Sequence, residues 1–484
     1  MVSNAPDFLK KYLKKAIDIL FFCFIMVIIP MNNNHVWRLF IGIITMYRET
    51  KQKLIDWKNR KQRKPLLITG VRQCGKTYLM EEFGAEHFDH ILKINFERNE
   101  VFGQVFERDY DPDRILQELG YLIEGKPIDP EQTLVIFDEI QACPRAITAL
   151  KYFAESSKEN YILCAGSLLG VEIKRKGISF PVGKIERIRM FPLSFREFVK
   201  AAGGERYLQL LSSYDLYQEI PSYVTEPMLT YLKQYFIIGG MPAVVQKWID
   251  TQNYDLVDEQ QDMILRDYKD DFSNHAEIKD VLKIGWVWDS LPKQLAKENN
   301  KFVFSHVKEG ARARDLEDAL TWLIDAGLAY KLEKVEHPEI PLSTFSDAVS
   351  FKVYMADTGL LRKKAGVSYK TILTEPESYV GFKGAMAENY CLQELTVQNI
   401  TPYYWHSGNT SKVDFLFESG DQIIPMETKS ADNTKAKSFM NYLKKYDPAI
   451  GFRVSTKNIG DNQKGKTQEI SLPLYLLWRI KEYV

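Results

Sequence analysis

The sequence predicts an α/β protein with a doubly wound parallel sheet first, a helical middle and a smaller α/β unit at the end. Short apolar runs at 66–69, 91–96, 134–137 and 161–165 alternate with helical sequence, as strands buried inside a parallel sheet do. Helical periodicity then dominates 226–365, and a hairpin pattern follows at 413–429. The 484 residues leave room for about three domains of roughly 150 residues.

Composition narrows the class of protein. The chain is 45% hydrophobic and 26% charged, which is ordinary for a folded protein with sizeable cores. Lys plus Arg and Asp plus Glu both number 64, so any nucleic-acid surface has to be a local patch. The cysteines are odd in number and lack CxxC spacing, which predicts reduced thiols in the cytoplasm and no zinc site. They are Cys23, Cys74, Cys143, Cys164 and Cys391.

The first 45 residues form an apolar leader, in which 19–31 follow four lysines. This run is too short for a membrane span, which needs about 20 apolar residues. A signal sequence fits the basic-then-apolar order, but no small-residue cleavage site follows. We favour a true start at Met46 or Met31, with a peripheral membrane anchor as the second interpretation. A membrane partner is therefore not expected.

The stretch from 65 to 83 carries the pattern G-x-x-x-x-G-K-T between a strand and a helix that opens at Thr77. Gly70 and Gly75 let backbone N–H groups close on a β-phosphate. Lys76 supplies charge to the β/γ oxygens, and the Thr77 hydroxyl is a Mg²⁺ ligand. The alternative is a chance glycine-rich turn. The residues expected to hold the nucleotide here are Gly70, Val71, Arg72, Gln73, Cys74, Gly75, Lys76, Thr77 and Tyr78.

Two later strands complete the predicted site for ATP and Mg²⁺. The run LVIFDEI, 134–140, ends in Asp138, which would hold Mg²⁺ through its water shell, and Glu139, which would polarise the attacking water. A buried strand that ends in solvent-facing acids is the alternative. The strand 161–165 is followed by Gly166 and Ser167, and the Ser167 hydroxyl could touch the γ-phosphate.

Arginines offer a further catalytic group. Arg187 or Arg189 could be an arginine finger that stabilises charge on the transferred phosphoryl group, in cis or from a neighbouring subunit. Solvated surface charge is an equally good interpretation. Arg72 could contact phosphate, although packing of the loop explains it equally well.

Together, GVRQCGKT, LVIFDEIQ, AGS at 165–167 and FPLSFREF resemble a bacterial and archaeal AAA-type ATPase family. Its members carry a C-terminal domain of unknown function that resembles PD-(D/E)XK nucleases. The similarity runs from Met46 to beyond residue 430 and includes GGMPAVV, FKVYMADTGLL and FKGAMAENY. The resemblance implies ATP hydrolysis and, by analogy with AAA-type rings, a homo-oligomer. The family usually has TGS where this chain has Ala165-Gly166-Ser167.

The middle region reads as three helices followed by a strand, which is the order of a winged helix. Arg312 and Arg314 stand at the start of the third helix, where they could meet DNA phosphates. Four acids on the same helix weaken groove binding, so a protein-packing module is the alternative.

Near the end, VDFLFE and QIIPMETK form a predicted hairpin with a Gly420-Asp421 turn. This register places Asp414 opposite Glu427, with Cβ atoms about 5 Å apart, and Lys429 on the same face. Like charges placed opposite each other cost stability, so a metal ion is the natural reason to keep them together. Pro425 predicts an edge strand or a bulge here.

Two carboxylates that bind Mg²⁺ beside a lysine are the equipment for phosphodiester hydrolysis. Glu388, in the helix predicted over 383–399, is a possible further metal ligand. The arrangement resembles the PD-(D/E)XK active site at Glu388, Asp414, Glu427 and Lys429, which makes DNA or RNA the implied partner. A nuclease-like fold without catalysis is the alternative.

The predicted organisation is a leader at 1–45, an AAA-type ATPase domain at 46–225, a winged-helix-like region at 226–365 and a nuclease-like domain at 366–484. The chain is expected to hydrolyse ATP with Mg²⁺ and to act on or bind nucleic acid. The competing hypothesis is a nucleotide-switched interaction module whose C-terminal fold cuts nothing.

Overall fold

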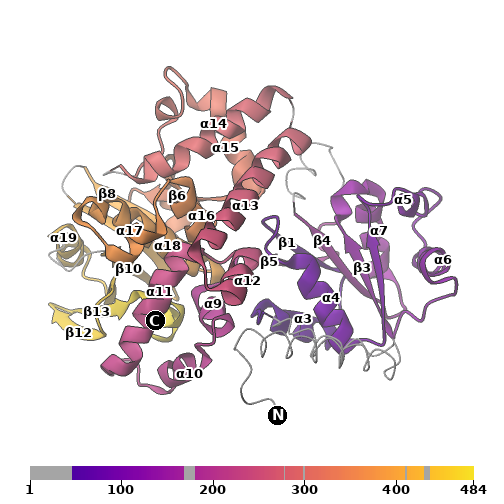
Figure 1. Cartoon of the computed structure of the whole chain (residues 1–484), viewed down its shortest axis with the longest axis horizontal. Coiled ribbons are helices and arrows are strands. Elements are labelled where there is room, and N and C mark those ends of the chain that lie inside the picture. Colours follow the sequence, from indigo (N-terminus) through magenta and orange to yellow (C-terminus); the bar gives the residue numbers. More distant parts are fainter. Residues whose placement is uncertain (1–45, 168–179, 277, 298–299, 409–410, 430–436) are drawn as a thin grey trace, which may run out of the picture.

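The computed structural model describes residues 46–167, 180–276, 278–297, 300–408, 411–429 and 437–484. The predicted leader and Cys23 lie outside the described residues. Figure 1 shows two lobes, one built on the first sheet and one that contains the rest of the described chain. The first lobe holds the nucleotide motifs and the second holds the predicted hairpin.

A five-stranded, wholly parallel sheet forms the first lobe, as predicted, in the order β2-β3-β4-β1-β5 (Figure 1). Its strands are β1 (Leu66–Gly70), β2 (His90–Asn95), β3 (Thr133–Asp138), β4 (Tyr161–Gly166) and β5 (Glu186–Met190). The helices of this lobe are α3 (Thr50–Lys58), α4 (Lys76–His87), α5 (Val101–Gln104), α6 (Pro112–Glu124) and α7 (Pro144–Glu155).

Alternate side chains of this sheet enter two different cores. Leu66 and Ile68 pack in one cluster with Phe83 of α4. Leu67, between them in sequence, packs in a second cluster with Ile147 of α7. Helices therefore cover both faces of the sheet, and both faces are apolar along the inner strands β3 and β4, which are buried on both sides.

The second lobe begins with helices and ends on an eight-stranded mixed sheet. Its first helices are α9 (Phe195–Ala201), α10 (Glu205–Ser213), α11 (Ser222–Ile238), α12 (Pro242–Thr251), α13 (Tyr254–His275), α14 (Ile278–Leu295) and α15 (Ala313–Asp325). Four more follow: α16 (Thr358–Lys364), α17 (Tyr369–Thr374), α18 (Val380–Val397) and α19 (Lys437–Tyr446).

The sheet order is β12-β13-β11-β10-β9-β8-β6-β7. The first strands along the chain are β6 (Ala329–Val335), β7 (Ser346–Met355), β8 (Tyr403–Ser407) and β9 (Ser411–Ser419). The others are β10 (Gln422–Thr428), β11 (Ile450–Ser455), β12 (Gly460–Lys464) and β13 (Thr467–Pro473).

Helices α14 and α15 precede the antiparallel pair β6–β7, but the described residues between them form only the short 3₁₀ helix Phe304–His306 in place of the further helix predicted for a winged helix. However, β6 also pairs in parallel with β8. The β6–β7 pair is therefore part of the C-terminal sheet. This sheet extends across the domain boundary predicted at residue 365.

The hairpin β9–β10 has the predicted register, with Gln422 opposite Ser419 and Met426 opposite Phe415. The prediction that Pro425 marks an edge or a bulge in the return strand is wrong, because β10 lies inside the sheet and its pairing with β9 is regular. The proline is tolerated because β11 pairs only with residues 426–428 of β10.

The four cysteines among the described residues are all free thiols in buried positions. Across the same residues, no helix combines the length and the apolar character that crossing a membrane requires.

Candidate functional sites

The P-loop follows β1, and its glycines are there for steric reasons. A Cβ on Gly70 would lie 2.1 Å from the carbonyl oxygen of Met190 in the neighbouring strand β5. Gly75 has φ 92°, in the left-handed region that favours glycine, immediately before α4 begins at Lys76. The loop therefore turns tightly from strand to helix, with the helix N-terminus at its end.

Lys76 lies folded over its own loop. Its Nζ donates to the carbonyl oxygens of Gly70 at 3.0 Å and Val71 at 2.9 Å. These contacts hold the ammonium group at the start of the loop, where a P-loop lysine meets the β/γ-phosphates.

Asp138 ends β3 beside the start of α4. The Thr77 hydroxyl donates to both carboxylate oxygens of Asp138, at 3.1 and 3.2 Å. A hydroxyl can ligate Mg²⁺ directly, and a carboxylate beside it can hold one of the waters of the ion, so these two oxygen donors fit the ion that the motif implies. Burial, followed by the charge of Glu139, raises the pKa of Asp138, and a bound cation would relieve that cost.

Asn95 and Lys93 also surround this carboxylate, which the sequence did not reveal. Asn95 Nδ2 lies 3.4 Å from Asp138 Oδ2, and Lys93 Nζ lies 3.8 Å from it. Asn95 ends β2 directly opposite Asp138 in the parallel register. A polar residue at the carboxyl end of the adjacent strand was the available signal.

Glu139 has a left-handed backbone, with φ 48°, which is unusual for this residue type. Its Oε2 accepts hydrogen bonds from Gln141 Nε2 at 2.6 Å and from the Ser167 hydroxyl at 3.3 Å. The two groups that the sequence placed near the γ-phosphate, Glu139 and Ser167, therefore lie together. Gln141 is an additional partner, and it follows the DE pair directly in the chain.

Several P-loop side chains point away from a phosphate site and toward α13. Arg72 Nη1 pairs with Asp271 at 2.5 Å, and Gln73 Nε2 donates to Asp267 at 2.7 Å. Tyr268 on the same helix donates to the backbone oxygen of Arg72 at 3.1 Å. This geometry favours loop packing as the role of Arg72.

Arg48, a buried arginine outside the motif, also contacts the P-loop. Its Nη1 donates to the carbonyl oxygen of Cys74 at 2.9 Å. Tyr78, in the first turn of α4, is 39% exposed.

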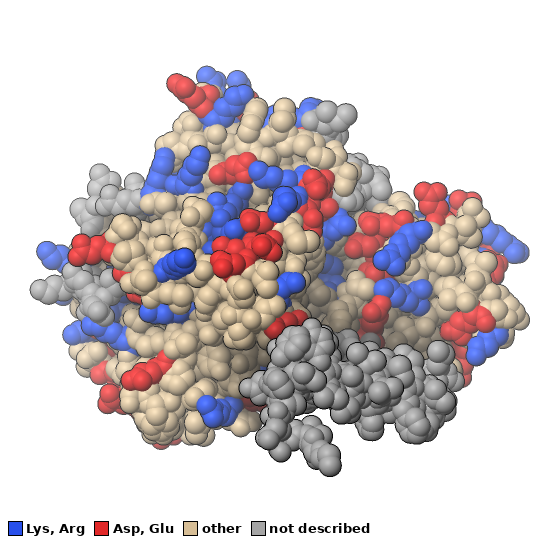
Figure 2. Space-filling view, viewed as in Figure 1, with Lys and Arg blue, Asp and Glu red and all other residues tan. Residues whose placement is uncertain are grey.

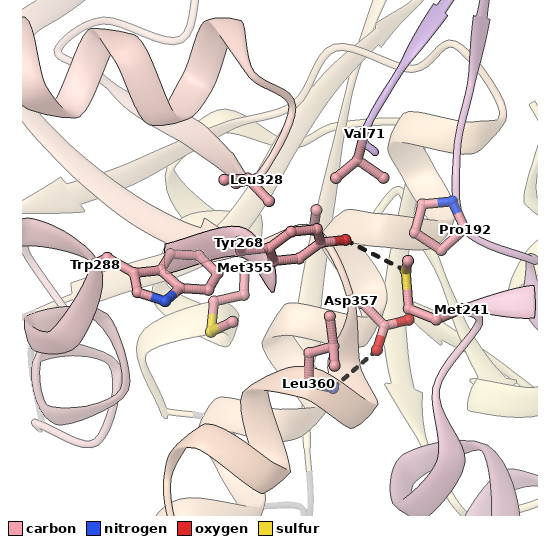
Figure 3. Close-up of a pocket in the computed structure, with 10 residues that line it drawn as sticks. Val71, Pro192, Met241, Tyr268, Trp288, Leu328, Met355, Asp357 and Leu360 are labelled. Atoms are coloured by element: carbon pink, nitrogen blue, oxygen red, sulfur yellow. Dashed lines mark hydrogen bonds between the residues drawn. The ribbon is translucent and has the colours of Figure 1, made fainter. Parts of the chain in front are cut away.

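A small cavity of about 10 Å³ lies behind the loop (Figure 3). Val71 lines it from the P-loop, and Tyr268, Met241, Trp288 and Asp357 line it from the second lobe. A space of this size holds at most about one water molecule. It marks where the P-loop packs against the second lobe and is too small for a nucleotide.

The two candidate finger arginines lie on β5, at one edge of the first sheet. Arg187 is opposite Leu67, and its guanidinium lies 4.1 Å from the centre of the Phe180 ring. Arg189 is opposite Thr69, one residue before Gly70, which is closer to the P-loop along the strand. Arg189 rather than Arg187 therefore has the more favourable position in cis.

The carboxylate pair in the second lobe forms where β9 and β10 run side by side. Residues 403 and 405 of β8 pair with 416 and 413 of β9, so Tyr404 alone faces two residues, Asp414 and Phe415. A bulge of this kind re-aims a side chain. Asp414 Oδ2 accepts from the backbone N–H of Thr428 at 3.0 Å, next to Glu427.

Each acid of this pair has one buried oxygen without a hydrogen-bond partner. These atoms are Asp414 Oδ1 and Glu427 Oε2, and the residues are only 3% and 1% exposed. Lys429 Nζ binds the other oxygen of Glu427 at 2.6 Å. Burial raises the pKa of both acids. The charge of Glu388 raises the pKa of Asp414 further, and the charge of Asp414 does the same for Glu427. Two unpartnered oxygens in an acidic pair fit a divalent cation.

Glu388 of α18 is engaged differently. Its Oε2 accepts from Asn300 Nδ2 at 2.9 Å and the Tyr354 hydroxyl at 2.8 Å, and it lies 3.2 Å from Lys352 Nζ. Burial works to raise the pKa of Glu388, but Lys352 and these hydrogen bonds hold it below its usual value. Within the described ranges, no three acidic, His or Cys side chains gather closely enough for a metal ion. The structure therefore offers a carboxylate pair rather than the predicted triplet, and Asn300, Lys352 and Tyr354 were not predicted.

The arginines of the middle region stand at the start of α15. The backbone N–H of Arg312 donates to Asp315 at 2.9 Å, and Arg314 Nε lies 3.8 Å from Asp315. Acidic and basic side chains are interspersed over the face of the molecule shown in Figure 2, without one extended basic surface.

Three parts of the chain match models of known protein families. Residues 62–199 match a family model described as an AAA domain. Residues 229–371 and 383–475 match two models described as domains of unknown function (DUF8612 and DUF4143). No curated protein matches the chain.

Three solved structures that match the chain are all distant from it. A Walker-type ATPase of Pyrococcus abyssi is 14% identical with a TM-score of 0.39, covering 66% of this chain and 96% of its own. The ORC2 protein of Aeropyrum pernix is 13% identical with a TM-score of 0.33, covering 68% and 94%. The ORC1 protein of that organism, solved with DNA, is 11% identical with a TM-score of 0.28, covering 69% and 96%. TM-scores this low add no argument about this chain. The matched residues 62–199 contain the P-loop and the contact of Thr77 with Asp138.

Proposed function

We propose that the protein binds ATP with Mg²⁺ in its P-loop domain and hydrolyses it. The observation that carries this proposal is the contact of the Thr77 hydroxyl with Asp138, which joins the P-loop helix to the end of β3. Lys76 lies over the loop on one side of this pair, and Glu139 follows it on the other. A polyphosphate, a metal ion and an attacking water each have a suitable group.

Each residue of the P-loop site has its own role in ATP binding and hydrolysis. The loop amides and Lys76 bind the β- and γ-phosphates, and Thr77 and Asp138 hold the magnesium ion, which neutralises charge on the phosphates. Glu139 accepts from Gln141 and Ser167, so its carboxylate is held at the end of β3, where it orients water for attack on the γ-phosphate. Arg187 or Arg189, at the sheet edge, supplies positive charge from its own or a neighbouring subunit in a homo-oligomer.

A steady-state ATPase assay with parallel binding measurements tests this proposal. Glu139→Gln should lower kcat by roughly 100-fold or more while nucleotide still binds, because only the water-orienting group is lost. Glu131→Gln, an exposed change in the loop before β3, is the matched control and should keep full activity. Unchanged hydrolysis by Glu139→Gln would overturn the assignment.

We further propose that the second lobe uses Asp414 and Glu427 to hold a divalent cation and cleaves a phosphodiester of nucleic acid. The two unpartnered oxygens support the cation, and Lys429 beside Glu427 is placed to orient water. A metal-dependent nicking assay should show cleavage that is lost in both Asp414→Ala and Lys429→Ala.

The competing function is a nucleotide-switched interaction module. The pairing of Glu427 with Lys429 and of Glu388 with Lys352 favours it, since each ion pair satisfies charge without a metal. Absence of cleavage on DNA and RNA with every divalent metal supplied, together with intact ATP hydrolysis, would establish this alternative over the nuclease.

A further inference from the structure

Lysines converge on the carboxylate pair from several strands of the second sheet. Lys412 of β9 stands directly opposite His406 of β8, which places their Cβ atoms about 5 Å apart. Lys334 of β6 is the register partner of Tyr404, two residues before His406. Three neighbouring strands therefore bring two lysines and two aromatic rings to one place.

Two further lysines come from the segment before β8. Lys352 of β7 is buried, and its Nζ lies 5.1 Å from the centre of the Tyr404 ring. Lys301 is exposed, and its Nζ lies 3.2 Å from the hydroxyl of Ser350 in β7. Neither residue belongs to the region 366–484, so the site depends on β7, which carries Lys352, and on the segment between α14 and α15, which carries Lys301.

The aromatic rings form a stack at this place. Tyr404 and His406 have ring centroids 6.2 Å apart and planes inclined by 22°. Tyr404 is buried, while His406 is partly exposed and hydrogen-bonds the Gly408 carbonyl at 3.1 Å. Burial, followed by the charges of Lys334, Lys301 and Lys352, lowers the pKa of His406. His406 is therefore a neutral ring in a positive field near pH 7.

The charged groups around these rings fall into two sets, exposed or half-buried lysines and buried acids. The buried acids are Glu388, Asp414 and Glu427. Asp347 is the register partner of Lys334 across β6–β7, so one rim lysine has an acid beside it. We define the lysine rim as Lys301, Lys334 and Lys412, with Lys352 and Lys429 below it against the carboxylates.

We propose that the lysine rim binds the phosphate backbone of a nucleic-acid strand and that His406 stacks on one of its bases. This inference rests on the second part of the proposed function, and it names the surface that delivers a phosphodiester to Asp414 and Glu427. The components match the ligand, since lysines suit phosphates, a neutral ring suits a base, and a cation-fitting acid pair suits the bond between nucleotides.

Nucleic acid explains more of the surface than an anionic lipid does. A lipid headgroup would use the lysines but would give no reason for two unpartnered carboxylate oxygens below them or for a stacked ring among them. Both features are expected where a strand is held across a metal-binding acid pair.

The test is fluorescence anisotropy of the full chain with labelled single-stranded DNA, duplex DNA and RNA, in EDTA so that cleavage plays no part. The triple variant Lys301→Ala, Lys334→Ala and Lys412→Ala should bind roughly 10- to 100-fold more weakly, with a salt dependence shallower by about two phosphate contacts. His406→Ala should weaken binding of single strands more than of duplex, because a paired base cannot stack on it.

A matched control removes the same charge elsewhere on the sheet. Lys457, Lys464 and Lys466 are exposed around β12, at the opposite edge, and changing all three to alanine should leave affinity within about twofold. Equal affinity of the rim variant and wild type, or rim-dependent binding of phosphatidylserine vesicles without binding of nucleic acid, would overturn the proposal. Rim-dependent binding without cleavage in Mg²⁺ would support the rim and refute the nuclease alone.

Discussion

The two candidate sites differ in how they satisfy their own charged groups. In the P-loop domain, Lys76 binds loop carbonyls and Thr77 binds Asp138. In the second lobe, Asp414 and Glu427 each keep a buried oxygen without a partner. A bound cation would relieve the cost of a buried acid at both sites. At the first site the Thr77 hydroxyl already bonds both oxygens of Asp138, whereas at the second site a cation would also give partners to two buried oxygens that lack one.

The difference follows from how each site is assembled. The P-loop is one continuous segment whose hydrogen bonds close locally. The carboxylate site combines a helix, a bulged strand and a hairpin with β7, and packing between these separate elements holds the like charges together.

Gly70→Ala should have the largest effect and should break the first site alone. The added Cβ would meet the Met190 carbonyl at 2.1 Å, so the loop or β5 has to move. We expect a loss of roughly 3 kcal/mol or more in the unfolding free energy of the first lobe, and loss of ATP binding. Urea unfolding and a nucleotide titration check this. Gly285→Ala is the control, because no atom lies within 4 Å of its Cβ position.

Glu394→Gln tests a buried acid within the second lobe, the lobe that carries the Asp414–Glu427 pair. Glu394 of α18 accepts from the backbone N–H of Phe195 at the start of α9. Burial raises its pKa to about 8 from an ordinary 4.5. The folded state thus holds a proton that the unfolded state releases, so stability falls as pH rises from about 4.5 to about 8.

The Gln variant lacks this titration and should be more stable than wild type above pH 8, by on the order of a few kcal/mol. The advantage should vanish near pH 5. Denaturation curves between pH 5 and 9 measure it, with exposed Glu309→Gln as control. A wild-type advantage at high pH would contradict the buried-acid account.

Divalent cations sharpen the contrast at the second site. Mn²⁺ or Mg²⁺ at about 100 times its Kd should stabilise the wild-type protein by about 2.7 kcal/mol. Asp414→Asn keeps an oxygen for the Thr428 N–H but removes one charge, so it should raise metal-free stability and lose most of the metal-induced shift. Thermal unfolding with and without metal is the measurement. An equal shift in both proteins would place the ion elsewhere.

Arg72→Ala should have the smallest effect. Its guanidinium pairs with Asp271 and is partly exposed, so its loss should cost about 1 kcal/mol or less. ATP affinity should change by less than about threefold, since the side chain points to α13. A large loss of affinity in the binding titration would instead make Arg72 a phosphate ligand.

The sequence predicted what depends on local pattern. The strand–loop–helix of the P-loop, the parallel sheet and the β9–β10 register all follow from short-range periodicity and turn residues. The contact of Thr77 with Asp138 followed because parallel strands in one sheet end at the same edge.

What the sequence did not predict depends on long-range packing. Lys352 and Tyr354 reach Glu388 because β6 and β7 join a sheet whose other strands, β8 to β13, begin only at Tyr403. The position of Arg187 could not be predicted without the register of β5 against β1. The unpartnered oxygens depend on side-chain packing that no pattern encodes.

The proposed function depends on Lys76 and the loop around it binding a nucleoside triphosphate. Equilibrium titration of a fluorescent ATP analogue with Mg²⁺ into wild type, Lys76→Ala and Lys51→Ala tests it most directly. Lys51 is the control because it lies in α3 and pairs with Glu82 and Glu86 of α4 in the same lobe. We predict saturable binding by wild type and Lys51→Ala, and at least about 100-fold weaker binding by Lys76→Ala. Equal affinity of Lys76→Ala and wild type would contradict the account.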